Sequence, residues 1–402
     1  MREMYNMRDL TILFVYTYPF NPLRGEIESV TYSLAKELKG RGYEVKYLSL
    51  TRTKNIEYDY PVPVYYFPSE DYRSKENYDF YFNFLEKHHI DIVINQDACF
   101  RDSILYLSKI PGSKIKYISV FHSTPVLNYK YFVRDQLLFS KKILSLRNIA
   151  KFCYRCLAVW NRRRELLKER RYMFDFVCKN SDFVCLLSSS FKKDIIEYLA
   201  LKIPSHIVSI PNPNKYRDLE INIGEKENII LFVGRLDMQS KRPDRIIRVW
   251  NHICYEYPEW TLYIVGDGAC KQDLELLARG NSQIVFTGFQ DPYIYYRRAK
   301  IICMTSNYEG LPMVLIEAMQ CRVVPVAFNS FASVTDIIDD GRNGILIKPF
   351  SIKQYEKALR QLMDNPDLLN RMSKYAQQDI KRYSVENVVD LWEQLFKECV
   401  VK

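Results

Sequence analysis

The sequence has no apolar run that approaches the ~20 residues needed to cross a bilayer as a helix. Residues 1–10 are polar and charged and do not resemble a secretory signal. We therefore expect a cytoplasmic protein. Hydrophobic residues occupy 48% of the positions and charged residues 26%, proportions typical of a soluble protein. The length of 402 residues is sufficient for two or three domains.

The sequence also lacks the signatures of metal, redox, dinucleotide and nucleic-acid sites. Cys153 and Cys156 form its single C-x-x-C pair, and no second pair stands at zinc-binding spacing. The segment Val265-Gly-Asp-Gly268 does not complete the G-x-G-x-x-G pattern of dinucleotide-binding turns. None of the motifs of DNA- or RNA-binding modules is present. We expect no metal centre, no nucleic-acid partner, and buried thiols in the apolar runs around Cys185, Cys303 and Cys399.

Positive charge is in excess, and much of it lies in one segment. The formal net charge of +10 suits anionic partners such as nucleotides, nucleic acid or an acidic membrane surface. Eleven Lys and Arg residues stand between positions 141 and 171, against two glutamates, with aromatic and leucine side chains interleaved. Such a helix suits an anionic membrane, a solvated insert or nucleic acid. We expect an anionic membrane surface, at the inner face of the plasma membrane.

Apolar runs that alternate with helical patterns predict two parallel α/β domains. Strands separated by helices, each apolar throughout, belong to parallel sheets that are covered on both faces. The predicted strands of the first half are 11–16, 44–50, 62–67, 90–95, 116–121, 183–187 and 207–210. Those of the second half are 229–233, 262–265, 284–288, 301–304, 322–327 and 345–347. Residues 127–179 form a basic helical insert, and the polar stretch 215–228 is the linker.

One predicted strand end carries residues suited to a phosphorylated, hydroxyl-rich ligand. After the strand 301–304, the chain turns at Gly310 and enters a helix with Pro312 in its first turn. The free amides and the helix dipole favour an anion at such a position. Glu309 and Glu317 bracket the turn, where carboxylates can accept hydrogen bonds from hydroxyls of the same ligand. Both could equally be solvated helix residues.

Two other strand ends carry polar candidates. Gly234 allows a tight turn after the strand 229–233, and Arg235 and Lys241 flank that turn. A guanidinium and an ammonium together suit a diphosphate. His122 follows the strand 116–121, where it can hydrogen-bond a ligand, shuttle a proton or simply cap a loop.

Together these segments resemble the retaining glycosyltransferases of family 4, which have the two-domain GT-B fold. The matching pieces are Gly234-Arg235 with Lys241, Val265-Gly-Asp-Gly268, Glu309-Gly-Leu-Pro312 with Glu317, and Asp339-Asp-Gly-Arg-Asn-Gly344. The resemblance covers nearly the whole chain. It implies two Rossmann-like domains that face a cleft: an acceptor-side domain of residues 1–214 and a nucleotide-sugar-binding domain of residues 215–384. A last helix in residues 385–402 would cross back to the first domain.

The resemblance also implies residue roles. Arg235 and Lys241 would bind the donor diphosphate and stabilise the departing nucleotide. Glu309 would contact the donor sugar, Glu317 the ribose, and His122 the region of the reacting carbon. The remaining donor-binding positions would be Gly25, Gly310, Leu311, Pro312, Met313 and Val314.

The implied activity is transfer of a hexose or N-acetylhexosamine from a UDP- or GDP-linked donor. The acceptor would be a glycan or a lipid-linked glycan in cell-surface polysaccharide assembly. Such enzymes are described as metal-independent and retaining, with same-face attack, so no cofactor is expected and Glu309 is not assigned as a nucleophile. Two alternatives are a nucleotide-sugar epimerase of the same fold and a non-catalytic GT-B scaffold. Glu26 keeps the scaffold reading open, because the family often has a second glycine there.

Overall fold

The chain forms two compact units, one of residues 1–213 with 385–402 and one of residues 214–384. The computed structural model describes residues 7–21, 25–52, 60–126, 129, 132–133, 146–216 and 225–401. The sequence placed the boundary one residue later, after position 214. Most of the linker expected at 215–228 lies outside the described residues.

The first unit is built on a parallel sheet with the strand order β3-β2-β1-β4-β5-β6-β7. Its strands are β1 (Thr11–Tyr16), β2 (Glu44–Ser49), β3 (Val64–Tyr66), β4 (Ile92–Asn95), β5 (Lys116–Phe121), β6 (Phe183–Leu186) and β7 (Ile207–Ser209). The central strands are buried along nearly their whole length, which explains their continuous apolar runs. The strand order reverses between β1 and β4, and ligands of such sheets bind at the carboxyl ends beside this reversal.

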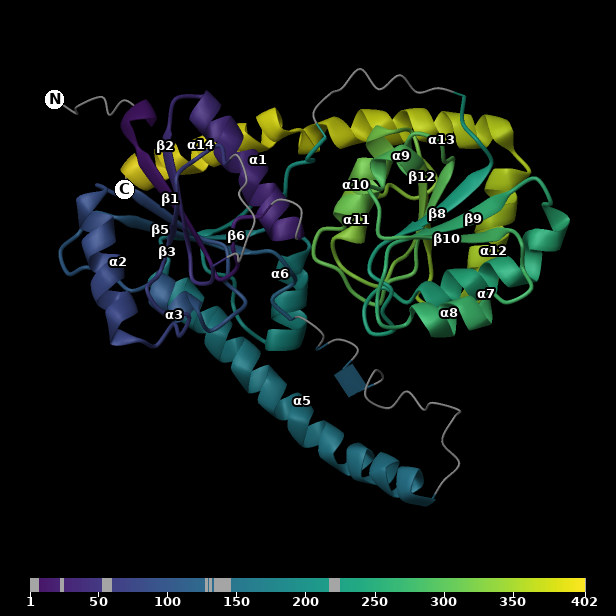
Figure 1. Cartoon of the computed structure of the whole chain (residues 1–402), viewed down its shortest axis with the longest axis horizontal. Helices are drawn as coiled ribbons and strands as arrows, with labels where there is room; N and C mark the ends of the chain where they lie inside the picture. Colours follow the sequence, from purple (N-terminus) through teal and green to yellow (C-terminus); the bar gives the residue numbers. More distant parts are fainter. Residues whose placement is uncertain are drawn as a thin grey trace. The chain divides into compact units, whose positions relative to one another are not determined.

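The helices of the first unit include the last helix of the chain. They are α1 (Glu26–Gly40), α2 (Lys75–Lys87), α3 (Ser103–Tyr106), α5 (Leu146–Asn180), α6 (Phe191–Asp194) and α14 (Val385–Val401), with a 3-10 turn at Met7–Asp9 and a π-helical turn at Ile195–Leu199. Helix α14 packs on α1, as Figure 1 shows, and Arg41 pairs with Asp390 at 2.6 Å and with Glu393 at 3.0 Å. These contacts join the C-terminal helix to the first unit.

Helix α5 is unusually long for this unit. It has 35 residues, and Figure 1 shows it, in teal, extending well beyond the sheet of the first unit. The sequence predicted helical structure from Tyr129 onward, and the observed α5 begins at Leu146. Most of positions 129–145 lie outside the described residues, as do Lys141 and Lys142 of the basic segment.

The second unit has a parallel sheet with the order β10-β9-β8-β11-β12-β13. Its strands are β8 (Ile229–Val233), β9 (Thr261–Val265), β10 (Ile284–Gly288), β11 (Ile301–Met304), β12 (Val324–Phe328) and β13 (Ile345–Ile347). Its helices are α7 (Pro243–Ile253), α8 (Lys271–Leu277), α9 (Tyr293–Tyr296), α10 (Met313–Gln320), α11 (Val334–Ile337), α12 (Ile352–Met363) and α13 (Pro366–Asp379), with 3-10 turns at Cys254–Glu256 and Ile380–Tyr383. The six strands fall where the sequence predicted them, within two residues.

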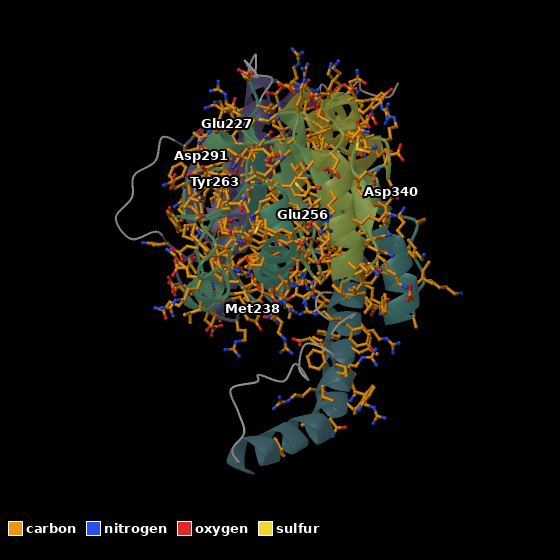
Figure 2. The ribbon with its side chains drawn as sticks, turned by 90° about the vertical axis from the view of Figure 1, so that its right-hand side faces the viewer. Glu227, Met238, Glu256, Tyr263, Asp291 and Asp340 are labelled. Atoms are coloured by element: carbon orange, nitrogen blue, oxygen red, sulfur yellow. The ribbon has the colours of Figure 1, made fainter. Side chains whose placement is uncertain are left out.

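The helices of the second unit cover both faces of its sheet. Helix α7 packs against α8 and α12, whereas α10 packs against α9 and α13, and Figure 1 shows these two groups on opposite sides of the strands. The fully buried Trp250 lies in the core between the sheet and the α7 layer. Glu227 precedes β8 and Met238 follows it, and they lie toward opposite ends of the view in Figure 2. The loops on the Met238 side of β8 belong to the carboxyl edge of the sheet.

Candidate functional site

Two loops at the carboxyl edge of the second unit are joined to each other. One loop follows β8 and the other follows β11, and these strands are neighbours in the sheet. The backbone N–H of Asn307 donates to the Ser240 carbonyl at 2.7 Å, and its side-chain amide donates to the Gln239 carbonyl at 2.7 Å. Asn307 is fully buried. The two loops therefore form one hydrogen-bonded platform.

Arg245 on α7 holds the loop after β11. Its guanidinium donates to the Thr305 carbonyl at 2.7 Å and to Oδ1 of Asn307 at 2.6 Å, and it stacks 4.2 Å from the ring centre of Phe350. It is only 6% exposed. Sequence reasoning missed both Arg245 and Asn307. The one available signal was an arginine within the otherwise apolar, core-facing side of α7.

Lys241 and Glu309 meet on this platform. The Lys241 ammonium lies 2.8 Å from each carboxylate oxygen of Glu309, and the Ser306 hydroxyl donates to the same carboxylate at 2.5 Å. The side chains are 22% and 10% exposed, so water screens the pair only in part. The sequence assigned these two residues to different parts of one ligand, and the structure brings them into direct contact.

Arg235 lies on the same loop as Lys241 but points to a different partner. Its Nε donates to Asp237 at 3.0 Å, and its side chain is 71% exposed. Asp237 also accepts hydrogen bonds from the backbone and the hydroxyl of Ser240. Burial acts to raise the pKa of Asp237, but these hydrogen bonds and the Arg235 charge outweigh it and lower the pKa. Asp237 thus stays ionised and holds the turn that presents Lys241.

Glycines allow the loop after β9 to lie close against the loop after β8. The N–H of Gly234 donates to the Val265 carbonyl at 3.0 Å, and the N–H of Leu236 donates to the Asp267 carbonyl at 2.9 Å. Gly266 has φ +141°, and a Cβ there would lie 2.1 Å from the Gly234 carbonyl oxygen. A Cβ at Gly268 would come within 2.5 Å of the Leu236 carbonyl oxygen. Only glycine fits this contact.

The predicted anion site lies at the start of α10. Helix α10 begins at Met313 with Pro312 as its N-cap, so the sequence was wrong by one residue in placing Pro312 inside the first turn. The carbonyl of Gly310 accepts a hydrogen bond from Ser333, and Ser330 donates to the Ser306 carbonyl at 2.7 Å. These serines, both from the loop after β12, hold the loop after β11 at Ser306 and at Gly310. The N-terminal amides and the dipole of α10 begin within four residues of Glu309.

Glu317 is held by partners other than the Lys241–Glu309 pair. It is 6% exposed, accepts a hydrogen bond from the Tyr296 hydroxyl at 3.0 Å, and lies 3.5 Å from the ammonium of Lys215. Burial raises the pKa of the Glu317 carboxyl, although Lys215 and Tyr296 oppose that effect. Glu317 therefore lies on the α9 side of α10.

An exposed aromatic ring stands at the end of β10, and sequence reasoning missed it. The pairing of β10 with β9 shifts register between Phe286 and Gly288, and Gly288 has φ +72°. This bulge redirects the chain, so Phe289 is 81% exposed. The Gly288 carbonyl accepts from the N–H of Gly266 at 2.9 Å, which joins the Phe289 loop to the glycine contact described above.

The candidate residues of the first unit also lie at the carboxyl edge of its sheet. The ring of His122 contacts the Gln96 side chain through Nε2, and Asn212 lies close enough to the imidazole to affect its pKa. The Asn212 amide donates to Glu26 at 3.2 Å. Enclosure of the imidazole lowers the pKa of His122 to about 3, although Asn212 acts in the opposite direction. His122 is therefore neutral at physiological pH.

Gly25 is the N-cap of α1, and Glu26 is the first residue of that helix. The backbone of Gly25 is extended, with φ −161°, and a Cβ there would lie 2.6 Å from a carboxylate oxygen of Glu28. The exposed Glu26 carboxylate turns toward Asn212. The acidic residue that departs from the family pattern is thereby hydrogen-bonded to Asn212, which lies near His122.

Among the described residues, no group of three or more His, Cys, Asp or Glu side chains is arranged to hold a metal ion. Within the same residues, no helix is both long and apolar enough to span a membrane. The thiols of Cys185, Cys303 and Cys399 are buried, as the sequence predicted.

Comparison with known proteins defines the class of this chain. The family described as "Glycosyltransferase Family 4" matches residues 27–213, and the one described as "Glycosyl transferases group 1" matches residues 218–379. These matches cover most of both units, and the platform lies within the second. The chain belongs to the family 4 glycosyltransferases.

Its sequence relatives carry names from the same class. An uncharacterized glycosyltransferase of Haemophilus influenzae is 32% identical over 192 residues, which are 47% of this chain and 54% of the relative. A Campylobacter jejuni protein is 28% identical over 177 residues, which are 43% of this chain and 49% of that one. It is named "GalNAc-alpha-(1->4)-GalNAc-alpha-(1->3)-diNAcBac-PP-undecaprenol alpha-1,4-N-acetyl-D-galactosaminyltransferase". The chain spans about half the length of these curated relatives.

Solved structures share the fold over nearly the whole chain. Anabaena HepE in complex with UDP and glucose superposes with a TM-score of 0.70 at 14% identity, covering 97% of this chain and 100% of that one. Staphylococcus aureus TarM, in a complex that includes UDP, gives a TM-score of 0.70 at 15% identity, covering 96% and 99%. The chain thus has the GT-B fold, with the two parallel α/β units as its two domains.

Proposed function

We propose that the protein is a retaining glycosyltransferase. It moves a hexose or N-acetylhexosamine from a UDP- or GDP-linked donor to a glycan or lipid-linked acceptor in cell-surface polysaccharide assembly. The reaction takes place in the cytoplasm, at the inner face of the plasma membrane. The observation that carries this proposal is the contact between Lys241 and Glu309, 2.8 Å apart and beside the N-terminus of α10.

The pair suits a nucleotide-sugar donor because its two members can bind different parts of one molecule. A diphosphate that enters beside α10 competes with Glu309 for the Lys241 ammonium. Once Lys241 binds phosphate oxygens, the Glu309 carboxylate is released to accept hydrogen bonds from sugar hydroxyls. Because Ser306 already orients that carboxylate, little further ordering is needed. Donor binding thus exchanges one internal ion pair for two contacts with the ligand.

The chemical step places negative charge on the leaving diphosphate. Cleavage of the bond between the anomeric carbon and the phosphate oxygen leaves an oxocarbenium-like sugar. The electron pair of the broken bond stays on the diphosphate. Lys241, the backbone N–H groups of Gly310, Leu311, Met313 and Val314, and the α10 dipole stabilise that charge. Arg235 adds a second cation, because its exposed side chain exchanges Asp237 for phosphate at little cost. We propose that these groups act without a metal ion.

Retention follows if the acceptor hydroxyl attacks the face from which the diphosphate departs. That hydroxyl then passes its proton to a departing phosphate oxygen, so no covalent sugar–enzyme bond forms. In this proposal Glu309 orients the sugar and is not a nucleophile. His122, neutral at physiological pH, acts as a hydrogen-bonding group and does not carry a positive charge.

The nucleoside is proposed to contact Glu317 and Phe289. Glu317 accepts from ribose hydroxyls by exchanging its bond with Lys215 or Tyr296. Phe289 offers an exposed ring at the end of β10, and stacking of a base on an aromatic ring contributes about 1–3 kcal/mol. The UDP in the solved HepE and TarM complexes supports a nucleoside diphosphate as the ligand class.

The names of the relatives support the acceptor class. The Campylobacter protein is named for a glycan linked to PP-undecaprenol, and an Erwinia amylovora relative, 31% identical over 186 residues, is named for amylovoran biosynthesis. These names favour a growing, lipid-linked surface glycan.

The proposal is tested by presenting the purified protein with a panel of UDP- and GDP-sugars, with and without a chelator. We expect binding and slow hydrolysis of at least one donor, unchanged by the chelator. If no nucleotide sugar binds, the protein is not a glycosyltransferase. If a donor is converted to its epimer without any acceptor, the same fold instead serves as a nucleotide-sugar epimerase.

A further inference from the structure

Two side chains that touch at the carboxyl edge of the first unit's sheet each have a buried nitrogen without a partner. Gln96 directly follows β4, His122 directly follows β5, and the two strands are neighbours. Oε1 of Gln96 contacts Nε2 of His122. Among the described residues, Nε2 of Gln96 and Nδ1 of His122 find no hydrogen-bond partner. A buried polar group left unpaired costs about 1–3 kcal/mol, a cost that a ligand pairing with it would offset.

The backbone on both sides of Gln96 is fixed by hydrogen bonds. The N–H of Gln96 donates to the Val15 carbonyl at 3.0 Å, and the N–H of Asp97 donates to Oδ1 of Asn95 at 2.9 Å. The Asp97 carboxylate in turn accepts from the N–H of Thr17 at 2.9 Å. Gln96 itself is buried. Its side-chain amide is therefore held in place before any ligand binds.

The contact with Gln96 determines which nitrogen of His122 carries the hydrogen. Burial lowers the pKa of His122 to about 3, so the neutral ring has one N–H group and one unprotonated nitrogen. Because Oε1 of Gln96 can only accept, Nε2 of His122 is the donor in this contact. The side-chain amide of Asn212, which also lies near the ring, donates to Glu26 at 3.2 Å. Nδ1 is therefore the unprotonated nitrogen and can accept a hydrogen bond.

We propose that Gln96 is a positioning residue: it holds His122 in the tautomer whose Nδ1 accepts a hydrogen bond from a hydroxyl of the transferred sugar. The inference rests on the proposed function and adds to it a requirement for a hydroxyl at this point of the sugar. A hydroxyl can donate to Nδ1 and can also accept from an amide N–H, which the unpaired nitrogen of Gln96 offers. An ether, a carbonyl or an ionised phosphate can only accept, so the pair of side chains disfavours these groups.

Heteronuclear NMR of the free protein tests the tautomer without any substrate. When histidine is isotope-labelled at its ring nitrogens, the chemical shifts and the couplings to the ring protons distinguish a protonated from an unprotonated nitrogen. The chain has five histidines, and the signals of His122 are those lost in His122→Gln. We expect Nε2 to be protonated and Nδ1 unprotonated. This pattern should not change from about pH 8 to about pH 5, because the ring does not titrate in that range.

Two variants of Gln96 separate positioning from folding. Gln96→Met removes the acceptor but keeps the length of the side chain, so both tautomers of His122 should appear in the spectrum. For the UDP- or GDP-sugar that the wild type hydrolyses fastest, kcat/KM should fall about tenfold, whereas the affinity for free UDP or GDP should not change. Gln96→Glu keeps an acceptor oxygen, so in mildly alkaline buffer it should keep Nε2 protonated and retain more activity than Gln96→Met. The exposed Gln354 of α12 supplies the control, Gln354→Met.

Monodeoxy analogues of the same donor test the requirement for a hydroxyl. The wild type should hydrolyse one of these analogues about tenfold more slowly than the parent donor, because Nδ1 of His122 then stays unpaired. Gln96→Met should discriminate between this analogue and the parent clearly less than the wild type does. Gln354→Met should discriminate like the wild type.

Four outcomes overturn the inference. The first is a wild-type spectrum in which Nδ1 of His122 carries the hydrogen, and the second is a Gln96→Met spectrum identical to that of the wild type. The third is undiminished discrimination against every monodeoxy donor by Gln96→Met. The fourth is an equal loss of nucleoside diphosphate affinity and donor hydrolysis in that variant, which would give Gln96 a structural role. If the wild type binds no nucleotide sugar, the proposed function fails, and the spectra still decide whether Gln96 sets the tautomer.

Discussion

The ammonium of Lys241 lies 2.8 Å from both carboxylate oxygens of Glu309, 68 residues farther along the chain. Each residue comes from a loop at the end of a different strand. The buried Asn307 joins the two loops, and Arg245 of α7 holds Asn307 in place. In the proposed function, the cation binds a diphosphate and the carboxylate binds a sugar. Removing either member should therefore affect different parts of donor recognition.

Replacement of Lys241 by Met should weaken the affinity for UDP or GDP by about tenfold to a hundredfold, since a charge-assisted hydrogen bond contributes about 1.5–3 kcal/mol. The measurement is calorimetric titration with the free nucleoside diphosphate. Lys357→Met on α12 serves as the control for removal of a lysine. Unchanged affinity in the Lys241 variant would remove Lys241 from the diphosphate site.

Replacement of Glu309 by Gln should lower donor hydrolysis without weakening the affinity for a nucleoside diphosphate. The amide keeps a contact with Ser306 but no longer competes for Lys241, so the affinity for a free nucleoside diphosphate should stay equal or increase. Donor hydrolysis should fall by about a hundredfold, because the sugar loses its carboxylate partner. A parallel loss of nucleotide affinity would show that Glu309 only supports the loop.

Replacement of Arg245 by Met should lower the free energy of unfolding by ~2–5 kcal/mol, because the Asn307 side chain and the Thr305 carbonyl each lose a buried, charged donor. The melting temperature and the denaturant midpoint measure this change. Arg248→Met is the control, because Arg248 lies on the same helix with its side chain 57% exposed. A small change in the free energy of unfolding for Arg245→Met would mean that the backbone contacts alone hold the loops.

The stability of the first unit should fall in acid partly through His122. Its folded pKa is about 3 and its unfolded pKa about 6.5, so the unfolded state binds more protons between these values. The contribution is fully present above pH ~6.5 and is lost as the pH falls toward ~3, by a few kcal/mol at most. His122→Gln should remove this part of the pH dependence. Parallel curves of unfolding free energy against pH for both proteins would contradict it.

Replacement of Phe289 by Ser should weaken nucleoside diphosphate binding by about tenfold, from the loss of one stacked base. Binding of inorganic pyrophosphate should not change, because that ligand has no base. Phe289→Tyr keeps the ring and should bind like the wild type. Equal weakening toward both ligands would place Phe289 in a structural role.

Local sequence patterns were sufficient to predict the strands, and they placed Lys241, Arg235 and Glu309 in the loops that follow those strands. Buried parallel strands appear as continuous apolar runs, and the cations and the carboxylate stand directly after such runs. The patterns did not show that Lys241 and Glu309 touch, because that contact depends on Asn307 and Arg245 across more than sixty residues.

Other features depend on backbone geometry that a pattern does not contain. The exposure of Phe289 follows from a bulge and a positive φ at Gly288. The turn of Glu26 toward Asn212 joins positions 186 residues apart. The one-residue shift of Pro312 is within the usual uncertainty of a helix start.

The central claim is that a nucleotide sugar is cleaved at the Lys241–Glu309 pair. The most direct measurement is the release of nucleoside diphosphate from the donor panel by the wild type, Lys241→Met and Lys357→Met under identical conditions. The account predicts release by the wild type and the Lys357 variant, and at least a hundredfold less by the Lys241 variant. Equal release by all three proteins, or release by none, would contradict it.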